Sequence, residues 1–140
     1  MRMRVLTHTN QGKLLAIADD VTKLISADKA TDSIPPDYNC DGERLVVVVV
    51  KAKASYNDSV RRVISNFNRG VTANVAFIVD GTPETVQPLL ELTKECDANI
   101  MKDKILYING GLPFKFIKKV TPEERETVKA WCEDILANLK

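Results

Sequence analysis

Leu45-Val46-Val47-Val48-Val49-Val50 is the strongest strand signal in this sequence of 140 residues. Valine is typical of strands, because its branched side chain packs well on a pleated sheet and loses rotamer freedom in a helix. The run shows no alternation of apolar and polar residues, so we expect the strand to be buried on both faces. Such a strand belongs in the middle of a parallel sheet.

Strand-like and helix-like segments alternate on both sides of this run, in the predicted order β-α-β-β-α-β-α-β-α. The remaining strands are predicted at residues 3–8, 29–34, 74–79 and 104–108. The second of them is polar and stops at Pro35-Pro36, which suits an edge of the sheet. Apolar residues at helical spacing predict the inner faces of the helices, formed by Leu14, Ile17, Ala18, Val21, Leu24 and Ile25; by Val60, Val63, Ile64 and Phe67; by Val86, Leu89, Leu90 and Thr93; and by Val128, Trp131, Cys132, Ile135 and Leu139.

Capping residues mark the predicted helix ends. Asn57 or Asp58 is expected to cap the second helix, and Gly70 to close it. Thr82-Pro83-Glu84 predicts the start of the third helix, because a capping residue is followed by proline at the first helical position. Thr121-Pro122-Glu123-Glu124 predicts a capping box at the start of the last helix.

Parallel strands joined by helices predict a doubly wound α/β fold, in which a five-stranded parallel sheet lies between two layers of helices as a three-layer sandwich. Hydrophobic residues make up 44% of the chain and charged residues 28%, which is enough for one core and predicts a single domain over residues 1–140. The connection from Ile34 to Arg44 has only about ten residues, so we expect a loop or a single turn there.

Charge and hydropathy argue against several classes of protein. The chain has 20 Lys and Arg against 19 Asp and Glu, so its net charge is too small to produce an electrostatic field that attracts nucleic acid or a membrane surface. Its longest apolar run is far shorter than the roughly 20 residues of a membrane span. Met1-Arg2-Met3-Arg4 is not followed by the apolar region of a signal peptide. We therefore expect a cytoplasmic protein with no nucleic-acid or membrane partner.

Cysteine and histidine are scarce. Cys40, Cys96 and Cys132 are widely spaced and form no C-x-x-C motif, so we expect reduced thiols, with Cys96 and Cys132 as small core residues of helices. His8 is the one histidine, so the sequence argues against a zinc site built from nitrogen and sulfur ligands. A Ser/His/Asp triad could use only this histidine. We expect no metal site.

In an open α/β sheet, ligands bind outside the carboxyl ends of the strands, where neighbouring connections leave on opposite faces. This rule selects the loops at residues 7–13, 51–57, 80–85 and 109–116. The first loop offers hydroxyls, an amide, a glycine and a cation before a helix N-terminus, which favours an anion. Its residues are Thr7, His8, Thr9, Asn10, Gln11, Gly12 and Lys13. In the alternative, Thr9 or Asn10 caps the helix, Gly12 eases the turn and His8 packs or meets solvent.

The order of elements and this first loop resemble the flavodoxin-like family, including its short-chain flavodoxin and NADPH-dependent FMN reductase branches. The phosphate loop of that family has the form Thr/Ser-x-Thr-Gly-x-Thr/Ser. Thr7 and Thr9 occupy its first two hydroxyl positions, whereas Asn10 replaces the glycine and Gly12 the last hydroxyl. The resemblance implies strand order 2-1-3-4-5 and noncovalent binding of flavin mononucleotide (FMN), with the phosphate in this loop.

In its second loop the family often carries Gly-x-Pro-x-Tyr/Trp, whose aromatic ring stacks on the flavin. Here the segment is Lys51-Ala52-Lys53-Ala54-Ser55-Tyr56, without the glycine and proline. The resemblance implies flavin contacts from Lys53, Ala54, Ser55 and Tyr56. In that case the lysines would approach the phosphate or the reduced ring and raise the reduction potential. Alternatively, Tyr56 packs against the following helix and both lysines are solvated.

The third loop, Asp80-Gly81-Thr82-Pro83, is similar to the family's glycine-containing third flavin loop. The resemblance implies that Asp80, Gly81 and Thr82 contact the ring, and the alternative is a helix start after a strand. Asn109-Gly110-Gly111 is open to the same two interpretations, since paired glycines permit positive φ values for a turn or for ligand access.

The sequence thus predicts a flavodoxin-like protein that binds FMN and takes part in electron transfer with a redox protein partner. The flavin does the redox chemistry, so no catalytic residue is named, and an FMN-dependent oxidoreductase stays open. The alternative is a flavodoxin fold that has lost FMN and serves as an interaction module, because the phosphate loop is altered and the net charge is +1, whereas electron-carrying flavodoxins are acidic. A receiver domain is rejected, because Thr7-His8-Thr9 and Lys51-Ala52-Lys53 replace its acidic residues.

Overall fold

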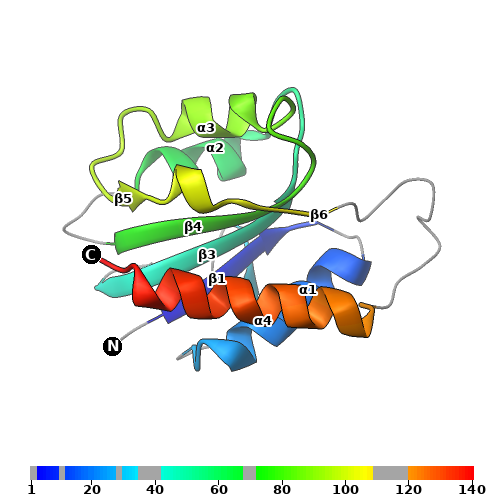
Figure 1. The fold of residues 1–140 in the computed structure, drawn as a ribbon. Coiled ribbons are helices and arrows are strands. Elements are labelled where there is room, and N and C mark those ends of the chain that lie inside the picture. Colours follow the sequence, from blue (N-terminus) through cyan, green and yellow to red (C-terminus); the bar gives the residue numbers. More distant parts are fainter. Residues whose placement is uncertain (1–2, 10–11, 28–29, 35–41, 68–71, 109–119) are drawn as a thin grey trace.

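The valine strand lies at the centre of a parallel sheet in the computed structural model, which describes residues 3–9, 12–27, 30–34, 42–67, 72–108 and 120–140. This strand is β3, Glu43–Lys51. Its neighbours are β1, Met3–His8, and β4, Thr72–Asp80, and both run parallel to it. Figure 1 shows the strands running in one direction across the molecule.

Short strands form the two edges of the sheet. On one side, β2 (Asp32–Ser33) pairs with β1. On the other, β5 (Asn99–Ile100) and β6 (Leu106–Ile108) both pair with β4, and a short 3-10 helix, η1 (Lys102–Lys104), separates them. The predicted order 2-1-3-4-5 is therefore confirmed, with two short strands sharing the fifth position.

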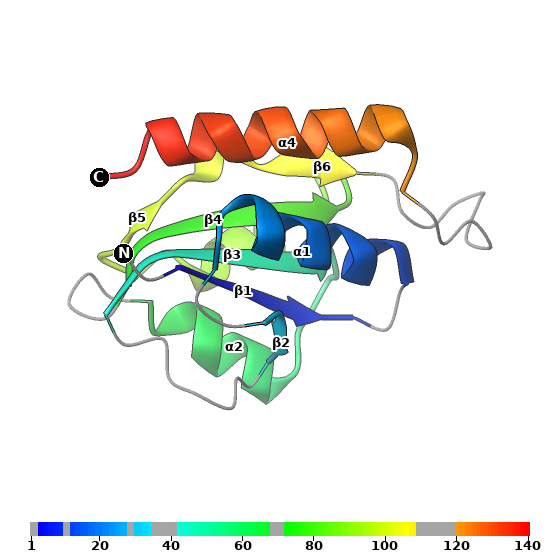
Figure 2. The same cartoon turned by 90° about the horizontal axis from the view of Figure 1, so that it is seen from below.

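Helices cover both faces of the sheet in the predicted three-layer arrangement (Figures 1 and 2). The helices α1 (Gly12–Leu24) and α4 (Pro122–Ala137) lie together on one face. The helices α2 (Asp58–Ser65) and α3 (Gln87–Leu92) lie on the other. The fold is a doubly wound α/β sandwich of the flavodoxin-like type.

The unbroken valine run is explained by two separate cores. The odd-numbered residues from Leu45 to Val49 pack in the cluster with α1 and α4, and the even-numbered residues from Val46 to Val50 pack in the cluster with α2 and α3. Each of these side chains is at most 1% exposed. Because successive strand residues face opposite sides, a strand covered on both faces is apolar at every position, as predicted.

Helix ends agree with the prediction at α2 and α4. The side chain of Asn57 caps α2 by accepting a hydrogen bond from Val60 N. The capping box of α4 is complete, with Thr121 and Glu124 bonding each other's backbone N–H groups. Helix α2 ends at Ser65, earlier than predicted, and Gly70 lies outside the described residues.

The third helix was predicted to begin too early. Residues 83–86 form a turn, and α3 begins at Gln87. Thr82 and Thr85 exchange hydrogen bonds between hydroxyls and backbone N–H groups, and such local bonds compete with the first turn of a helix. Thr93 is buried but follows the end of α3 as its C-cap. Leu24 in α1 is 39% exposed, because it lies at the border of the buried face.

The predicted strand at 104–108 is shorter in the structure, where Lys104 belongs to η1 and only Leu106–Ile108 is strand. Asn99–Ile100 is too short for any periodicity to predict. Cys96 lies beyond the end of α3 rather than within it, and its thiol donates to Ile64 O. Cys132 is buried in α4 as predicted, and burial raises its pKa to about 12. None of the described helices is long and apolar enough to cross a membrane.

Candidate functional site

Connections after three strands meet at the carboxyl edge of the sheet, at the right of Figure 1. The backbone N–H of Ala52, just after β3, donates to Asp80 O at the end of β4 at 3.0 Å. Gly81 N donates to Ile108 O, at the end of β6, at 3.3 Å. The second and third loops selected from the sequence are therefore continuous with each other and with the end of β6. Residues 109–116 fall in a segment that the structure does not describe.

The first loop is only partly described, because Asn10 and Gln11 lie outside the described residues. Thr7 is 2% exposed inside β1, where its carbonyl accepts from Ile34 N at 2.8 Å. Thr9 is partly exposed at the carboxyl edge, and Gly12 is the first residue of α1. The helix N-terminus thus lies where the sequence predicts it.

The cation of this loop already has a partner. The ammonium group of Lys13 forms an ion pair with Glu124 at the start of α4, and the Lys13 side chain is only 11% exposed. Burial acts to raise the pKa of Glu124, but hydrogen bonds from Lys13 and Thr121 outweigh it and hold the pKa below its ordinary value. Lys13 therefore joins the N-termini of α1 and α4.

His8 is held by the cap of α2. Its Nε2 lies 3.1 Å from the Asn57 side-chain nitrogen, while the Asn57 oxygen accepts from Val60 N at 2.9 Å. Because the capping oxygen fixes the orientation of the amide, Asn57 presents N–H to His8, and His8 Nε2 must accept. The N–H of the imidazole is then on Nδ1.

Tyr56 folds back onto its own loop. Its hydroxyl accepts from Lys53 N at 3.0 Å and donates to Lys51 O at 3.4 Å, and its half-buried ring packs on the core beneath α2. Burial raises the pKa of Tyr56, and the bond from Lys53 N opposes the rise. Ala54 and Ser55, between these residues, are exposed. The second loop is thus closed by its own tyrosine.

Gly81 is required by the close approach of two loops. A Cβ atom at this position would lie 2.7 Å from Ala52 Cβ and 2.7 Å from Thr85 Oγ1. Thr82 is bonded to Thr85 within the turn that follows. Asp80 ends β4 and its carbonyl accepts from Ala52, so the third loop supports the second.

A cavity of about 610 Å³ opens at the ends of β1, β2 and β3. It is lined by His8, Thr9, Ser33, Ile34, Lys51 and Lys53. Sequence reasoning missed Ser33 and Ile34, although the edge strand before Pro35-Pro36 ends at the same side of the sheet. The cavity therefore contains predicted residues from the first and second loops, while Asp80, Gly81 and Thr82 lie outside its lining.

Comparison with solved structures finds a similar backbone in the solution structure of two-electron reduced flavodoxin from Megasphaera elsdenii. The TM-score is 0.59, the sequence identity is 14%, and the match covers 94% of this chain and 98% of that one. A likeness at this identity establishes the flavodoxin-like fold alone. No protein-family model and no curated protein matches the sequence.

Proposed function

We propose that this chain binds FMN noncovalently at the carboxyl edge of its sheet and takes part in electron transfer. The observation that carries the proposal is the cavity of about 610 Å³ at the ends of β1 and β3, where connections leave on opposite faces of a flavodoxin-like sheet. This is where ligands of open α/β sheets bind, and the volume lies within the usual range for small-molecule sites.

The side chains at this edge suit a phosphorylated flavin. Lys51 and Lys53 supply positive charge, Thr9 a hydroxyl, and the start of α1 at Gly12 a helix dipole. Tyr56 places a half-buried ring beside the second loop. The bound flavin supplies the redox chemistry, and the chain binds it and adjusts its electrostatic surroundings. A redox protein would then exchange electrons with it.

Titration of flavin-stripped protein with FMN and with riboflavin, followed by quenching of flavin fluorescence, tests the proposal. We expect saturable quenching by FMN and at least about tenfold weaker binding of riboflavin, which lacks the phosphate. Equal affinity for FMN and riboflavin would show that the phosphate group does not contribute to binding. No saturation by either flavin up to about 100 μM would overturn FMN binding altogether.

A second candidate function is a flavodoxin fold that has lost its flavin and serves as an interaction module. Two residues at positions that contact flavin in the family favour this candidate, because their polar groups bond other parts of the same chain. Lys13 is paired with Glu124, and the Tyr56 hydroxyl is bonded to the backbone of its own loop. Absence of flavin binding in a well-folded protein would support this candidate.

A further inference from the structure

The cavity at the ends of β1, β2 and β3 reaches the α2 side of the sheet. Ile34, in its lining, is 4% exposed and belongs to the core beneath α2. His8 is bonded to Asn57, the cap of that helix. The N-terminus of α1 starts on the opposite face, since α1 packs with α4 there (Figure 2). The cavity thus extends from the first loop to the α2 side of the edge.

The described lining is positively charged. It contains Lys51 and Lys53 and no carboxylate. Within the described part of the chain, neither lysine forms an ion pair with an acidic side chain. The nearest acidic residue along β2, Asp32, is paired with the buried Arg4 at 3.1 Å. Asp80 lies opposite Lys51 in the strand register but is not part of the lining.

His8 adds a directed donor to this charge. Its Nε2 accepts from Asn57, so its proton resides on Nδ1. No described residue accepts a hydrogen bond from His8 Nδ1. An imidazole N–H, together with two ammonium groups, is suited to an oxyanion, because hydrogen bonds to a charged acceptor are among the strongest in proteins.

We propose that this cavity binds the dianion of a phosphate monoester, through Lys51, Lys53 and the Nδ1–H of His8. The inference goes beyond flavin binding, because it applies to any phosphorylated small molecule that reaches these three residues. FMN itself and a separate phosphorylated ligand are two sources of the same chemistry.

Inorganic phosphate is the first probe. In a phosphate-free buffer at about pH 8, where a phosphate group is mostly dianionic, we expect saturable shifts of the amide signals of residues 8, 51 and 53, with a dissociation constant on the order of millimolar. Sodium chloride at equal ionic strength should not reproduce these shifts, since screening alone has no preferred site. Shifts that are absent, or that chloride reproduces, overturn the proposal.

Two double variants of equal charge locate the site. Lys51→Ala with Lys53→Ala should weaken phosphate binding at least about tenfold. Lys94→Ala with Lys102→Ala removes two exposed lysines from a different cavity of about 540 Å³, beside α3, and should leave phosphate binding unchanged. Equal losses in the two variants would show a general charge effect and overturn the site.

Adding FMN to the phosphate-bound protein separates the two sources. If FMN displaces phosphate, the cavity takes the phosphate of the flavin; if both bind together, it takes that of another ligand, and either result supports the site. Phosphate binding without FMN binding refutes the proposed function alone. FMN binding without phosphate shifts at residues 8, 51 and 53 refutes this inference alone.

Discussion

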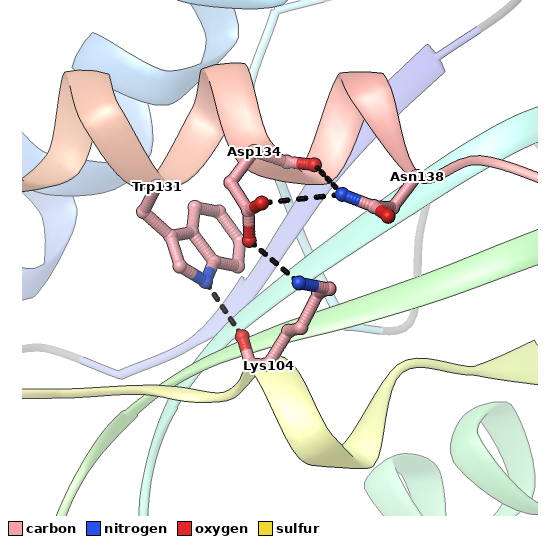
Figure 3. Close-up of polar contacts among 4 residues, drawn as sticks. All are labelled: Lys104, Trp131, Asp134 and Asn138. Atoms are coloured by element: carbon pink, nitrogen blue, oxygen red, sulfur yellow. Dashed lines mark hydrogen bonds and ion pairs between the residues drawn. The ribbon is translucent and has the colours of Figure 1, made fainter.

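Trp131 links α4 to η1, beside the edge of the sheet, through one hydrogen bond. Its Nε1–H donates to Lys104 O at 2.6 Å, and the side chain is 9% exposed (Figure 3). Trp131→Phe keeps an aromatic ring but leaves that carbonyl without its partner. We expect the free energy of unfolding to fall by about 1–3 kcal/mol, measured by urea denaturation.

The matched control for Trp131→Phe is Lys104→Ala, which keeps the accepting carbonyl and removes only the ion pair with Asp134 (Figure 3). Both partners of that pair are more than a third exposed, so the loss should be below about 1 kcal/mol. If the control destabilised the protein as much as Trp131→Phe, the indole bond would not be what fastens α4.

Glu124 gives the protein a contribution to stability that depends on pH. Its pKa in the folded state is below the ordinary value of 4.5, so the unfolded chain binds the proton more readily. The contribution is therefore fully present above about pH 4.5 and is lost as the pH falls through the folded pKa. Glu124→Gln keeps a side-chain oxygen for the capping box and removes the charge that Lys13 pairs with.

Urea unfolding of wild type and Glu124→Gln across pH 3–7 tests this contribution. We expect the wild type to be the more stable protein at neutral pH and the difference to shrink below the ordinary pKa of 4.5. A difference that stays constant over the whole range would mean that the charge of Glu124 does not stabilise the fold.

Single residues also mark the limit of what the sequence predicts at the site. Lys13 is recognisable as a cation before a helix, but its partner Glu124 is more than a hundred positions away along the chain. The sequence is compatible with both flavin stacking and packing for the ring of Tyr56. The bonds of its hydroxyl to its own loop depend on local geometry that no spacing encodes.

At the scale of elements, the N-terminus of α2 connects the helix to β1. Asn57→Asp should keep the cap, because an Asp oxygen also accepts from Val60 N. It removes the N–H that His8 Nε2 accepts and supplies an acceptor in its place. We therefore expect His8 Nε2 to carry a proton in this variant, which ¹⁵N spectra of the imidazole report directly.

A comparison of Asn57→Asp with Asn57→Ala shows whether the cap of α2 is kept. Asn57→Asp should shift the free energy of unfolding little, whereas Asn57→Ala, which loses the cap, should cost about 1 kcal/mol. An Nε2-protonated His8 already present in the wild type would contradict the assignment of the hydrogen bond with Asn57.

Elements with a strong apolar pattern were predictable, and those shaped by local polar bonds were not. The valine strand and the capping box of α4 needed only sequence-local rules, and both are in the structure. The start of α3 was misplaced because Thr82 and Thr85 bond each other. The two short strands at the fifth position follow from pairing with β4 rather than from their own composition.

At the scale of the whole molecule, Asn74 joins four segments at the amino edge of the sheet. Its side-chain nitrogen donates to Arg44 O and to Lys140 O. Its side-chain oxygen accepts from Asn99 Nδ2 at 2.8 Å and from Lys140 N at 3.0 Å. The Asn74 side chain is fully buried, so its own end of each bond is shielded from water.

Asn74→Ala should therefore lower the free energy of unfolding by about 2–4 kcal/mol, because it removes four part-buried hydrogen bonds made by one buried side chain. Hydrogen exchange should quicken most at β5 and after the end of α4, and least in the middle of β1 and β3. A uniform increase across all strands would contradict a local role for this asparagine.

The order of the elements and the two-sided core were within reach of the sequence, because they depend on periodicity and on general rules for parallel sheets. The cavity was not, because its wall combines residues 8–9, 33–34, 51 and 53, which the sheet order alone brings together. Asn74 was predicted only as the first residue of a strand, and its bonds to the far end of the chain carry no sequence signature.

The central claim is that the carboxyl edge of this flavodoxin-like sheet is a flavin site. Mapping FMN-induced shifts of the backbone amide signals onto the structure tests it most directly. We predict that the shifts concentrate at residues 7–9, 51–57 and 80–82. Shifts confined to the groove of about 270 Å³ between α1 and α4, which Leu24 and Arg125 line, or no shifts at all, would contradict the claim.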